Sequence, residues 1–353
     1  MYLYKCLLKQ FEEKRPFVVY RKPNADQMVG LFQKTRELHL IENFDEVGFV
    51  LAPFAQGKRF YIPLSESAII VEQAPQGKLD LEDVELNYND AIAKENFEDL
   101  VKRCVSAIKQ NVFGKVVPSR KESIQVDVQG DLEGLFNRLC LSYPTAFCYV
   151  IYHPEIGMWA GATPESLLKV KDGVLETMAL AGTQVNNGQQ DVVWEQKEKE
   201  EQQFVTDFIV ESLNPLANKI TVSEPFTKRA ARVMHICTSV VAELKENNVK
   251  VIVDALHPTP AVCGMPKAKA REFLINEEGY ERKYYAGYIG ELNCNVIEQT
   301  VEETDLYVNL RCMEVECDKV SLYIGCGVTK DSDPTSEFIE TVNKSSTMKK
   351  VLK

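Results

Sequence analysis

Residues 147–183, FCYVIYHPEIGMWAGATPESLLKVKDGVLETMALAGT, decide the fold class of this 353-residue chain. The stretch contains strand-like runs at 147–154, 158–170 and 173–183, rich in β-branched and aromatic residues and separated by turn residues. Short turns join antiparallel strands, whereas parallel strands need a long crossover. Similar runs occur on both sides of this stretch, at 115–126, 284–295, 304–316 and 319–328, without a regular alternation of strand and helix. The sequence therefore predicts an α+β fold with antiparallel sheets rather than a doubly wound parallel fold.

Further strands and several helices are predicted around this centre. The strands lie at 16–23, 47–54 and 67–73, between polar connectors. Helices are predicted at 94–110, 195–213, 227–246, 266–278 and 332–352. The last helix has the clearest start, because Ser332 or Asp333 can cap it and Pro334 suits its first turn.

The composition limits the class of protein. A chain that is 45% hydrophobic and 26% charged is typical of a globular enzyme with a sizeable core. Its net charge of −11 argues against a nucleic-acid partner, because phosphate binding needs a concentrated positive surface. The N-terminus does not resemble a signal peptide, and no run is long enough for a membrane span. Ten cysteines occur without a C-x-x-C pair, so we expect a cytoplasmic protein with buried, reduced thiols and no membrane partner.

Two pairs of glutamates have a spacing that suits a metal ion. Glu198 and Glu201 lie in one predicted helix and Glu337 and Glu340 in another, each pair on one helix face. The alternative is a solvated helix start that suits the helix dipole, and it is stronger for the first pair. If the two helices face each other, they form an oxygen-only site of the kind that Mg²⁺ prefers.

A lysine and a glutamate are candidates for proton transfer. Lys115 enters an apolar strand in FGKVVPSR, where burial favours the neutral amine that a general base needs. Glu165 follows a strand and a turn in AGATPESLL, where apolar surroundings let a carboxyl group keep its proton at neutral pH. Each also has a plainer interpretation, as a solubilising lysine and as a glutamate at a helix start. Arg311, in the predicted strand YVNLRC, needs an acidic partner, which a substrate carboxylate would supply.

The glycines and histidines add little by themselves. Glycines at 181–183 and 325–327 serve turns or let backbone N–H groups approach an anion. None of the four histidines has ligand spacing, so no zinc centre is predicted. His235 is interpreted as a structural residue on the helix predicted at 227–246. His257 begins a proline-punctuated segment, which favours a rigid wall over a mobile loop.

Several segments resemble, in order, the successive motifs of the chorismate-utilising enzymes. They are KVVPSR, GATPESLL, ETMALAGT, LHPTPAVCGMPKAKA, YYAGYIG, NLRCMEV and YIGCGVTKDSDPTSEFIETVNK. The family includes isochorismate, salicylate, anthranilate and aminodeoxychorismate synthases. The resemblance implies one large α+β domain over residues 1–353, with two packed antiparallel β-sheets flanked by outer helices. Residues 1–92 would form a divergent N-terminal part of the sheets, and residues 93–353 the motif-bearing catalytic core.

The resemblance also implies roles for residues. Lys115 would be the general base and Glu165 the general acid, and Mg²⁺ would be bound by Glu201 and Glu340 with Glu198 and Glu337 as near neighbours. The metal would hold the ring carboxylate of chorismate, assisted by the turn at Gly182 and Thr183. The remaining substrate contacts implied are Arg311 and the Gly325 backbone for the enolpyruvyl carboxylate, with Lys344, His257, Ala261 and Tyr285 near the pocket.

Three positions separate the members of the family. Aminodeoxychorismate synthases carry a lysine nucleophile where this chain has Ala181, anthranilate synthases lack the equivalent of Lys115, and salicylate synthases have Thr at Ala261. These residues are most similar to those of an isochorismate synthase, which adds water at C2, loses the C4 hydroxyl and needs no glutaminase subunit. Salicylate synthase remains the alternative, since Tyr284 and Tyr285 add hydroxyls near the pocket that the resemblance implies, and a catalytically silent chorismate-binding subunit is another. The product would feed menaquinone or siderophore biosynthesis.

Overall fold

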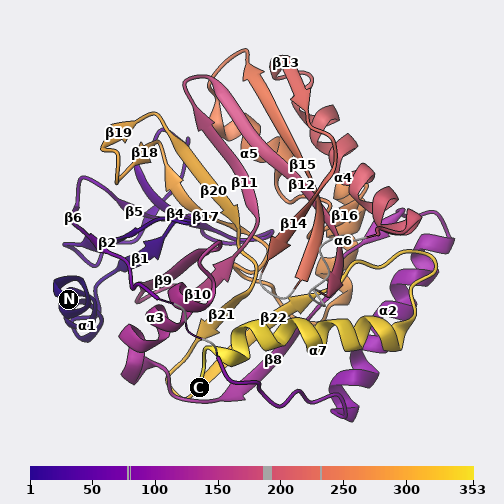
Figure 1. The fold of residues 1–353 in the computed structure, drawn as a ribbon, viewed down its shortest axis with the longest axis horizontal. Coiled ribbons are helices and arrows are strands. Elements are labelled where there is room, and N and C mark those ends of the chain that lie inside the picture. Colours follow the sequence, from indigo (N-terminus) through magenta and orange to yellow (C-terminus); the bar gives the residue numbers. More distant parts are fainter. Residues whose placement is uncertain (78, 80, 186–192, 231–232) are drawn as a thin grey trace.

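Two antiparallel sheets form the framework of the molecule (Figure 1). The structure is a computed structural model, and it describes residues 1–353 apart from 78, 80, 186–192 and 231–232. The first sheet has eight strands, in the order β6 (Ser67–Gln73), β2 (Gln27–Gln33), β1 (Phe17–Arg21), β9 (Phe147–His153), β10 (Gly157–Thr163), β21 (Cys312–Val315), β22 (Lys319–Gly325) and β8 (Ser119–Gln125). The second sheet has the order β13 (Ala217–Val222), β15 (Val233–Leu244), β12 (Val174–Val185), β11 (Ser166–Lys171), β20 (Thr304–Val308), β17 (Tyr288–Leu292), β4 (Gly48–Ala52), β5 (Phe60–Pro63) and β3 (His39–Leu40).

Three further pairings complete the strands. β14 (Phe226–Ala230) pairs with β15 beyond the end of β13, and two small sheets pair β16 (Gly264–Met265) with β7 (Lys115–Val116) and β18 (Cys294–Asn295) with β19 (Thr300–Val301). The stretch 147–183 forms β9, β10, β11 and β12, and each pairs with its neighbours in antiparallel fashion. This confirms the α+β fold with two antiparallel sheets.

The chain crosses between the two sheets at two points that matter for function. β10 belongs to the first sheet and β11 to the second, and only Pro164 and Glu165 separate them. The chain crosses back between β20 and β21, through Asn309, Leu310 and Arg311. Side chains at both crossings are therefore held where the two sheets meet.

Helices cover the outer faces of the sheets, as expected. They are α1 (Tyr2–Glu12), α2 (Ala91–Lys109), α3 (Leu132–Ser142), α4 (Gln196–Leu213), α5 (Val249–Leu256), α6 (Lys267–Glu277) and α7 (Pro334–Lys350), with a 3₁₀ turn at Gln129–Asp131. One apolar core includes the inner faces of both sheets together with α2, α4, α5 and α6. A second core lies under α1, α3 and the end of α7, on the outer face of the first sheet. Among the described residues, no helix has the length and apolar character to cross a membrane.

Four of the predicted helices are confirmed, as α2, α4, α6 and α7. α7 is capped by Asp333, whose Oδ1 accepts a hydrogen bond from the backbone N–H of Ser336 at 2.8 Å. All ten cysteines lie in the described part of the chain and are free thiols. Of these ten, only Cys317 is exposed. The helices α1, α3 and α5 have no counterpart in the sequence prediction.

The helix predicted at 227–246 is wrong, because this segment forms β14 and β15. β15 pairs with β12 along one edge and with β13 and β14 along the other. Its first half is buried at every position from Met234 to Thr238, whereas buried and more exposed positions alternate from Ser239 to Leu244. A strand buried on both faces reads as a continuous apolar run, which a helical spacing pattern matches equally well. Its β-branched residues Ile236, Thr238, Val240 and Val241 are typical of a strand.

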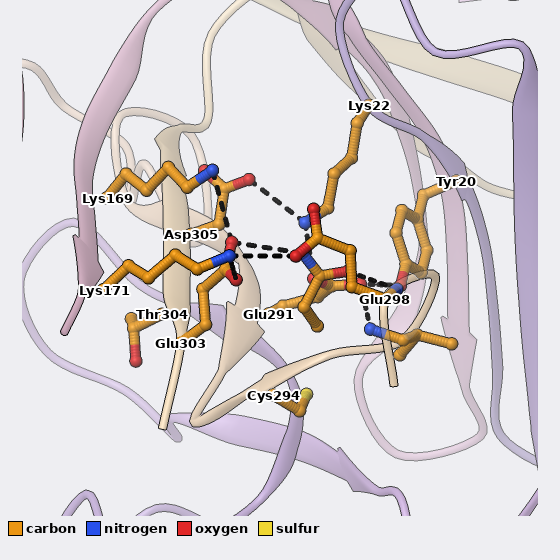
Figure 2. Close-up of polar contacts among 12 residues, drawn as sticks. Tyr20, Lys22, Lys169, Lys171, Glu291, Cys294, Glu298, Glu303, Thr304 and Asp305 are labelled. Atoms are coloured by element: carbon orange, nitrogen blue, oxygen red, sulfur yellow. Dashed lines mark hydrogen bonds and ion pairs between the residues drawn. The ribbon is translucent and has the colours of Figure 1, made fainter. Parts of the chain in front are cut away.

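A buried ionic cluster joins the two sheets (Figure 2), and none of its residues named here lines the cavity described below. Lys22 follows β1 of the first sheet, and its Nζ lies 2.6 Å from Oε2 of Glu291 on β17 and 3.2 Å from Oδ2 of Asp305 on β20. Lys169 and Lys171 of β11 each lie 3.2 Å from the carboxylate of Glu303. The side chains of Glu291 and Glu303 are almost fully buried, so these lysines compensate charges that water cannot reach.

Candidate active site

A cavity of about 230 Å³ opens where the sheet crossings meet α4 and α7. It brings together most of the site residues predicted from sequence. These are Lys115, Glu165, Gly182, Ala261, Tyr285, Arg311, Gly325, Lys344, Glu198, Glu201, Glu337 and Glu340. Ala181, which distinguishes members of the family, also lines it. The side chain of Thr183 lies outside the described residues, and only its place in β12 is given.

Glu165 is buried at the first sheet crossing. Its backbone carbonyl accepts from the N–H of Val308 at 2.9 Å, which fixes the crossing against the end of β20. Burial raises the pKa of Glu165 to about 7, although the cations Lys228, Arg311 and Lys115 act in the opposite direction. A carboxyl group with this pKa is about half protonated at pH 7, as a general acid requires.

Lys115 enters the cavity from β7. This two-residue strand pairs with β16 and ends before Pro118, after which the chain begins β8. The Nζ of Lys115 lies 3.9 Å from Oε1 of Glu201. A Cβ at position 327 would lie 3.3 Å from Cε of Lys115 and 3.7 Å from Oε1 of Glu201. Gly327 thus leaves the room in which the lysine and the glutamate approach each other.

One wall of the cavity is acidic. Glu198 and Glu201 come from α4, Glu337 and Glu340 come from α7, and all four line the cavity. Oε2 of Glu198 is buried and has no hydrogen-bond partner among the residues that the structure describes. No three of these four described carboxylates bring oxygens within 4.8 Å of one another. The wall therefore offers separated oxygen donors, which suits a cation that takes one or two carboxylates and completes its shell with water or substrate.

The other wall can bind anions. The sequence predicted Arg311 in a strand, but the residue lies in the second sheet crossing, where its φ is 46°. Its guanidinium has no hydrogen bond or ion pair to any described residue, and desolvation lowers its pKa. Nearby, Nζ of Lys344 donates to the carbonyl of Gly325 at 3.2 Å and lies 2.5 Å from Oε1 of Glu340. An unpaired, desolvated guanidinium is well suited to a bidentate carboxylate.

The histidines exchange the roles that the sequence predicted for them. His257 does not line the cavity, since its ring packs edge-on against Tyr288 with a centroid distance of 5.0 Å, and burial lowers its pKa to about 3. His235 is not on a helix but in β15, and it does line the cavity. Its Nδ1 lies 2.9 Å from the carbonyl oxygen of Gly182, and burial lowers its pKa to about 4, so the imidazole is neutral at pH 7.

Two tyrosines form an aromatic part of the cavity wall, and the sequence predicted only one of them, Tyr285. Tyr285 lines the cavity, and its ring stacks on Tyr323, with 5.7 Å between centroids and 17° between planes. Tyr323 also lines the cavity, and its hydroxyl donates to Glu314 at 2.9 Å. Its position two residues before Gly325 in β22 is the one sequence signal, because alternate residues of a strand share a face. Tyr284 faces away, and its hydroxyl donates to the carbonyl of Lys58 at 3.1 Å.

Comparisons with known proteins identify the family of the chain. The profile of the chorismate binding enzyme family matches residues 53–353. The isochorismate synthase of salicylate biosynthesis from Pseudomonas aeruginosa is 32% identical over 277 residues, which are 74% of this chain and 56% of that protein. The isochorismate synthase MenF of Escherichia coli is 28% identical over 73% of this chain and 60% of that protein. The chain thus matches little more than half the length of these relatives.

Solved structures share the fold. The putative 2,3-dihydroxybenzoate-specific isochorismate synthase of Bacillus anthracis superposes with a TM-score of 0.77 at 24% identity, covering 98% of both chains. The menaquinone-specific isochorismate synthase of Escherichia coli gives a TM-score of 0.80 at 20% identity, covering 98% of this chain and 91% of that one. Because the family profile covers residues 53–353 and includes every wall of the cavity, the chain belongs to the chorismate binding enzyme family.

Proposed function

We propose that this chain is an isochorismate synthase, which adds water at C2 of chorismate with loss of the C4 hydroxyl. The observation that carries the proposal is one cavity holding both Lys115 and a Glu165 whose pKa burial raises to about 7. Exchange of a ring hydroxyl needs one group to accept a proton and another to donate one. Relatives named isochorismate synthase support the same reaction.

The mechanism assigns the two proton transfers to this pair. Arg311 would hold a carboxylate of chorismate, which supplies the acidic partner that its guanidinium lacks in the protein. Lys115 would take a proton from water as the oxygen of that water bonds to C2. The two ring double bonds then shift, the C4–O bond breaks, and Glu165 donates its proton to the departing hydroxyl, which leaves as water. His235 is neutral at pH 7, so it would add no charge to the cavity during these proton transfers.

The acidic wall supports Mg²⁺ as the cofactor. A dianionic substrate would be repelled by four glutamates unless a cation lay between them. Glu201 and Glu340 would hold the ion, with Glu198 and Glu337 next to it, and the partnerless Oε2 of Glu198 fits this role. Bound Mg²⁺ would supply positive charge for the ring carboxylate, beside Gly182 and Thr183. The sequence predicted these two residues in a turn, but they lie in strand β12, at its register shift.

The proposal is tested by product analysis. NMR of chorismate incubated with the protein and Mg²⁺ should show isochorismate. Lys115→Ala should lower kcat by about 10²–10⁴-fold, because the water loses its base, while chorismate still binds. Lys109→Ala, at an exposed position near the end of α2, is the matched control and should keep its activity. Turnover of Lys115→Ala near the parent rate would remove this lysine from the mechanism.

The metal is tested by titration. Glu340→Ala should raise the Mg²⁺ concentration for half-maximal activity by at least about tenfold, the loss usual even for groups in the outer shell of a metal. Glu200→Ala removes an exposed carboxylate of α4 and should leave the titration unchanged. An identical Mg²⁺ curve for Glu340→Ala and the parent would exclude Glu340 as a ligand.

Salicylate synthase is the second candidate. Tyr285, whose hydroxyl is the feature that favours this alternative, lines the cavity. Elimination of pyruvate would reveal itself as salicylate fluorescence in the same incubation, whereas Ala261 favours arrest at isochorismate. Activity with water alone, without glutamine or ammonium, would show that no glutaminase subunit is needed and would exclude a silent subunit. Menaquinone and siderophore biosynthesis both remain routes for the product.

A further inference from the structure

Lys228 of β14 lies on the side of the second sheet that faces the cavity. It stands opposite His235 in the antiparallel pairing of β14 with β15, and directly opposite residues project from the same face. His235 lines the cavity. Lys228 is therefore directed toward the site, although sequence reasoning did not single it out and it is not itself among the lining residues.

The side chain of Lys228 extends across β15 toward the proton donor. Its Nζ lies 3.2 Å from Sδ of Met178 on β12, the strand beyond β15. Leu180, two residues further along β12, shares the face of Met178 and lines the cavity. Glu165 lines the same cavity as Leu180 and His235, at the crossing just before β11, the strand that pairs with β12. The ammonium group therefore lies beside the part of the cavity wall that contains the carboxyl group.

Within the described part of the chain, this ammonium group has no carboxylate partner. Met178, a weak sulfur acceptor, is its one hydrogen-bond partner among the described residues. Most partly buried lysines in this structure do have an anionic partner, as Lys22 and Lys344 show. A cation placed beside a buried acid without a partner of its own is suited to stabilise the anion that forms when that acid loses its proton.

We propose that Lys228 is a positioning residue for the general acid, whose ammonium group stabilises the Glu165 carboxylate formed as the C4 hydroxyl departs. The proposal rests on the proposed function for the identity of the reaction. The proposal adds no further proton transfer to the mechanism. Glu165 gives its proton to the leaving oxygen, and Lys228 stays protonated throughout. Its contribution is a favourable interaction that strengthens as negative charge develops on Glu165.

Other charged groups surround Glu165, and they set the background for this effect. Burial raises the pKa of Glu165, and among the opposing cations Lys228 ranks before Arg311 and Lys115. The cavity is further lined by neutral His235 and by charged or titratable groups of α4, α7 and the strands, namely Glu198, Glu201, Glu337, Glu340, Lys344, Tyr285, Tyr323 and Cys326. Burial raises the pKa of Glu165 and Lys228 lowers it, so removal of Lys228 should raise this pKa further.

The first test compares Lys228→Met with Lys228→Arg in the full chain. Lys228→Met should lower kcat about tenfold with little change in KM, and should move the high-pH limb of kcat upward by about one unit. The limb moves upward because Glu165 then keeps its proton to higher pH. Lys228→Arg should restore both values. Lys219→Met removes an exposed lysine of the neighbouring β13, paired only with Glu243, and should behave as the parent.

The second test needs no turnover. The carboxyl carbon of Glu165 is titrated by NMR in protein carrying ¹³C-labelled glutamate, and Glu165→Gln identifies its signal. Lys228→Met should raise the midpoint, and Lys228→Gln replaces it if that variant fails to fold. An unchanged midpoint, or a kcat loss that Lys228→Arg does not restore, overturns the proposal. If the parent protein makes no isochorismate while the midpoint still moves, the proposed function fails and the coupling of Lys228 to Glu165 stands.

Discussion

The raised pKa of Glu165 comes from burial at its position in the fold rather than from a neighbouring charged group. The side chain lies at a crossing between two sheets, where burial disfavours its charged form more strongly than three cations favour it. The folded protein therefore binds this proton more tightly than the unfolded chain, whose glutamates titrate near the ordinary value of 4.5. A catalytic acid of this kind is a source of instability at neutral pH.

Glu165→Gln should reveal that instability. The folded-state pKa of Glu165, about 7, lies above its unfolded value, so its favourable contribution is complete below pH 4.5 and is lost as the pH rises through 7. The glutamine variant stays neutral, and its free energy of unfolding should exceed that of the parent by about 3 kcal/mol at pH 8 but by less than about 1 kcal/mol at pH 5. Urea unfolding at both pH values measures this. Glu211→Gln, on the exposed face of α4, should give equal values at both; a constant gap for Glu165→Gln would contradict the raised pKa.

At this scale, the sequence predicts residues whose roles depend on local spacing. The glutamate pairs of α4 and α7 are candidates because residues three apart share a helix face. Lys115 is a candidate because it enters an apolar strand and Glu165 because it follows a strand and a turn, and the order of the family motifs favours both over their plainer interpretations. His235 was missed because its role depends on which strand lies beside β15, a non-local fact. His257 was assigned to the pocket from its motif alone, yet its own segment directs its ring into the core.

Among the elements, the contact of α4 with β12 positions half of the acidic wall. Gly182 stands at the contact with a φ of 68°, and a Cβ there would lie 3.0 Å from Cβ of Glu198. Glycine is needed twice over, for the left-handed backbone and for the close approach of the helix. The position of Glu198 and Glu201 therefore depends on a residue that has no side chain.

Gly182→Ala should separate these two requirements. The left-handed backbone should lower the free energy of unfolding by about 1–2 kcal/mol, and displacement of α4 should raise the Mg²⁺ requirement several-fold. Gly173→Ala is the matched control, since its φ is 74° and no atom lies within 4 Å of its Cβ position. It should show a similar loss in urea unfolding and an unchanged Mg²⁺ titration. Equal Mg²⁺ curves for both variants would show that α4 does not depend on Gly182.

The elements themselves were predictable to differing degrees. Alternating strands joined by short turns, such as β9 and β10, and amphipathic helices with clear caps, such as α7, follow from local pattern. The segment 227–246 was assigned to the wrong class because the first half of β15 is buried on both faces and lacks the alternation that identifies a half-buried strand. Short α5, with eight residues, falls below the length at which periodicity separates a helix from an apolar strand.

For the whole molecule, the proposed function requires the two sheets to keep a fixed relative position. Glu165, the proposed acid, and Arg311, the proposed carboxylate ligand, both lie where the chain passes from one sheet to the other, so a shift between the sheets would move both. The buried ionic cluster around Lys22 links the same two sheets at a distance from the cavity (Figure 2). The cluster adds a specific, directional link to the non-directional packing of the apolar core.

Lys22→Met should show how much that link contributes. Removing the cation leaves Glu291 and Asp305 buried without it, and loss of one partner of a buried pair lowers the free energy of unfolding by about 3–5 kcal/mol. Burial already raises the pKa of Glu291 despite Lys22, so without the lysine this pKa rises further. The deficit should therefore narrow as the pH falls from 8 to 5, because a protonated Glu291 no longer needs a cation.

The matched control is Lys58→Met, whose ion pair with Glu155 is half exposed on both sides and should contribute about 0–1 kcal/mol at either pH. Urea unfolding at pH 8 and pH 5 gives all four values. The kcat and Mg²⁺ requirement of folded Lys22→Met should equal those of the parent if the apolar core alone holds the sheets in register. A loss of kcat in fully folded protein would instead show that the ionic cluster positions the sheet crossings, and with them the acid and the arginine. A stability deficit that does not change with pH would contradict the assignment of the buried charge to Glu291.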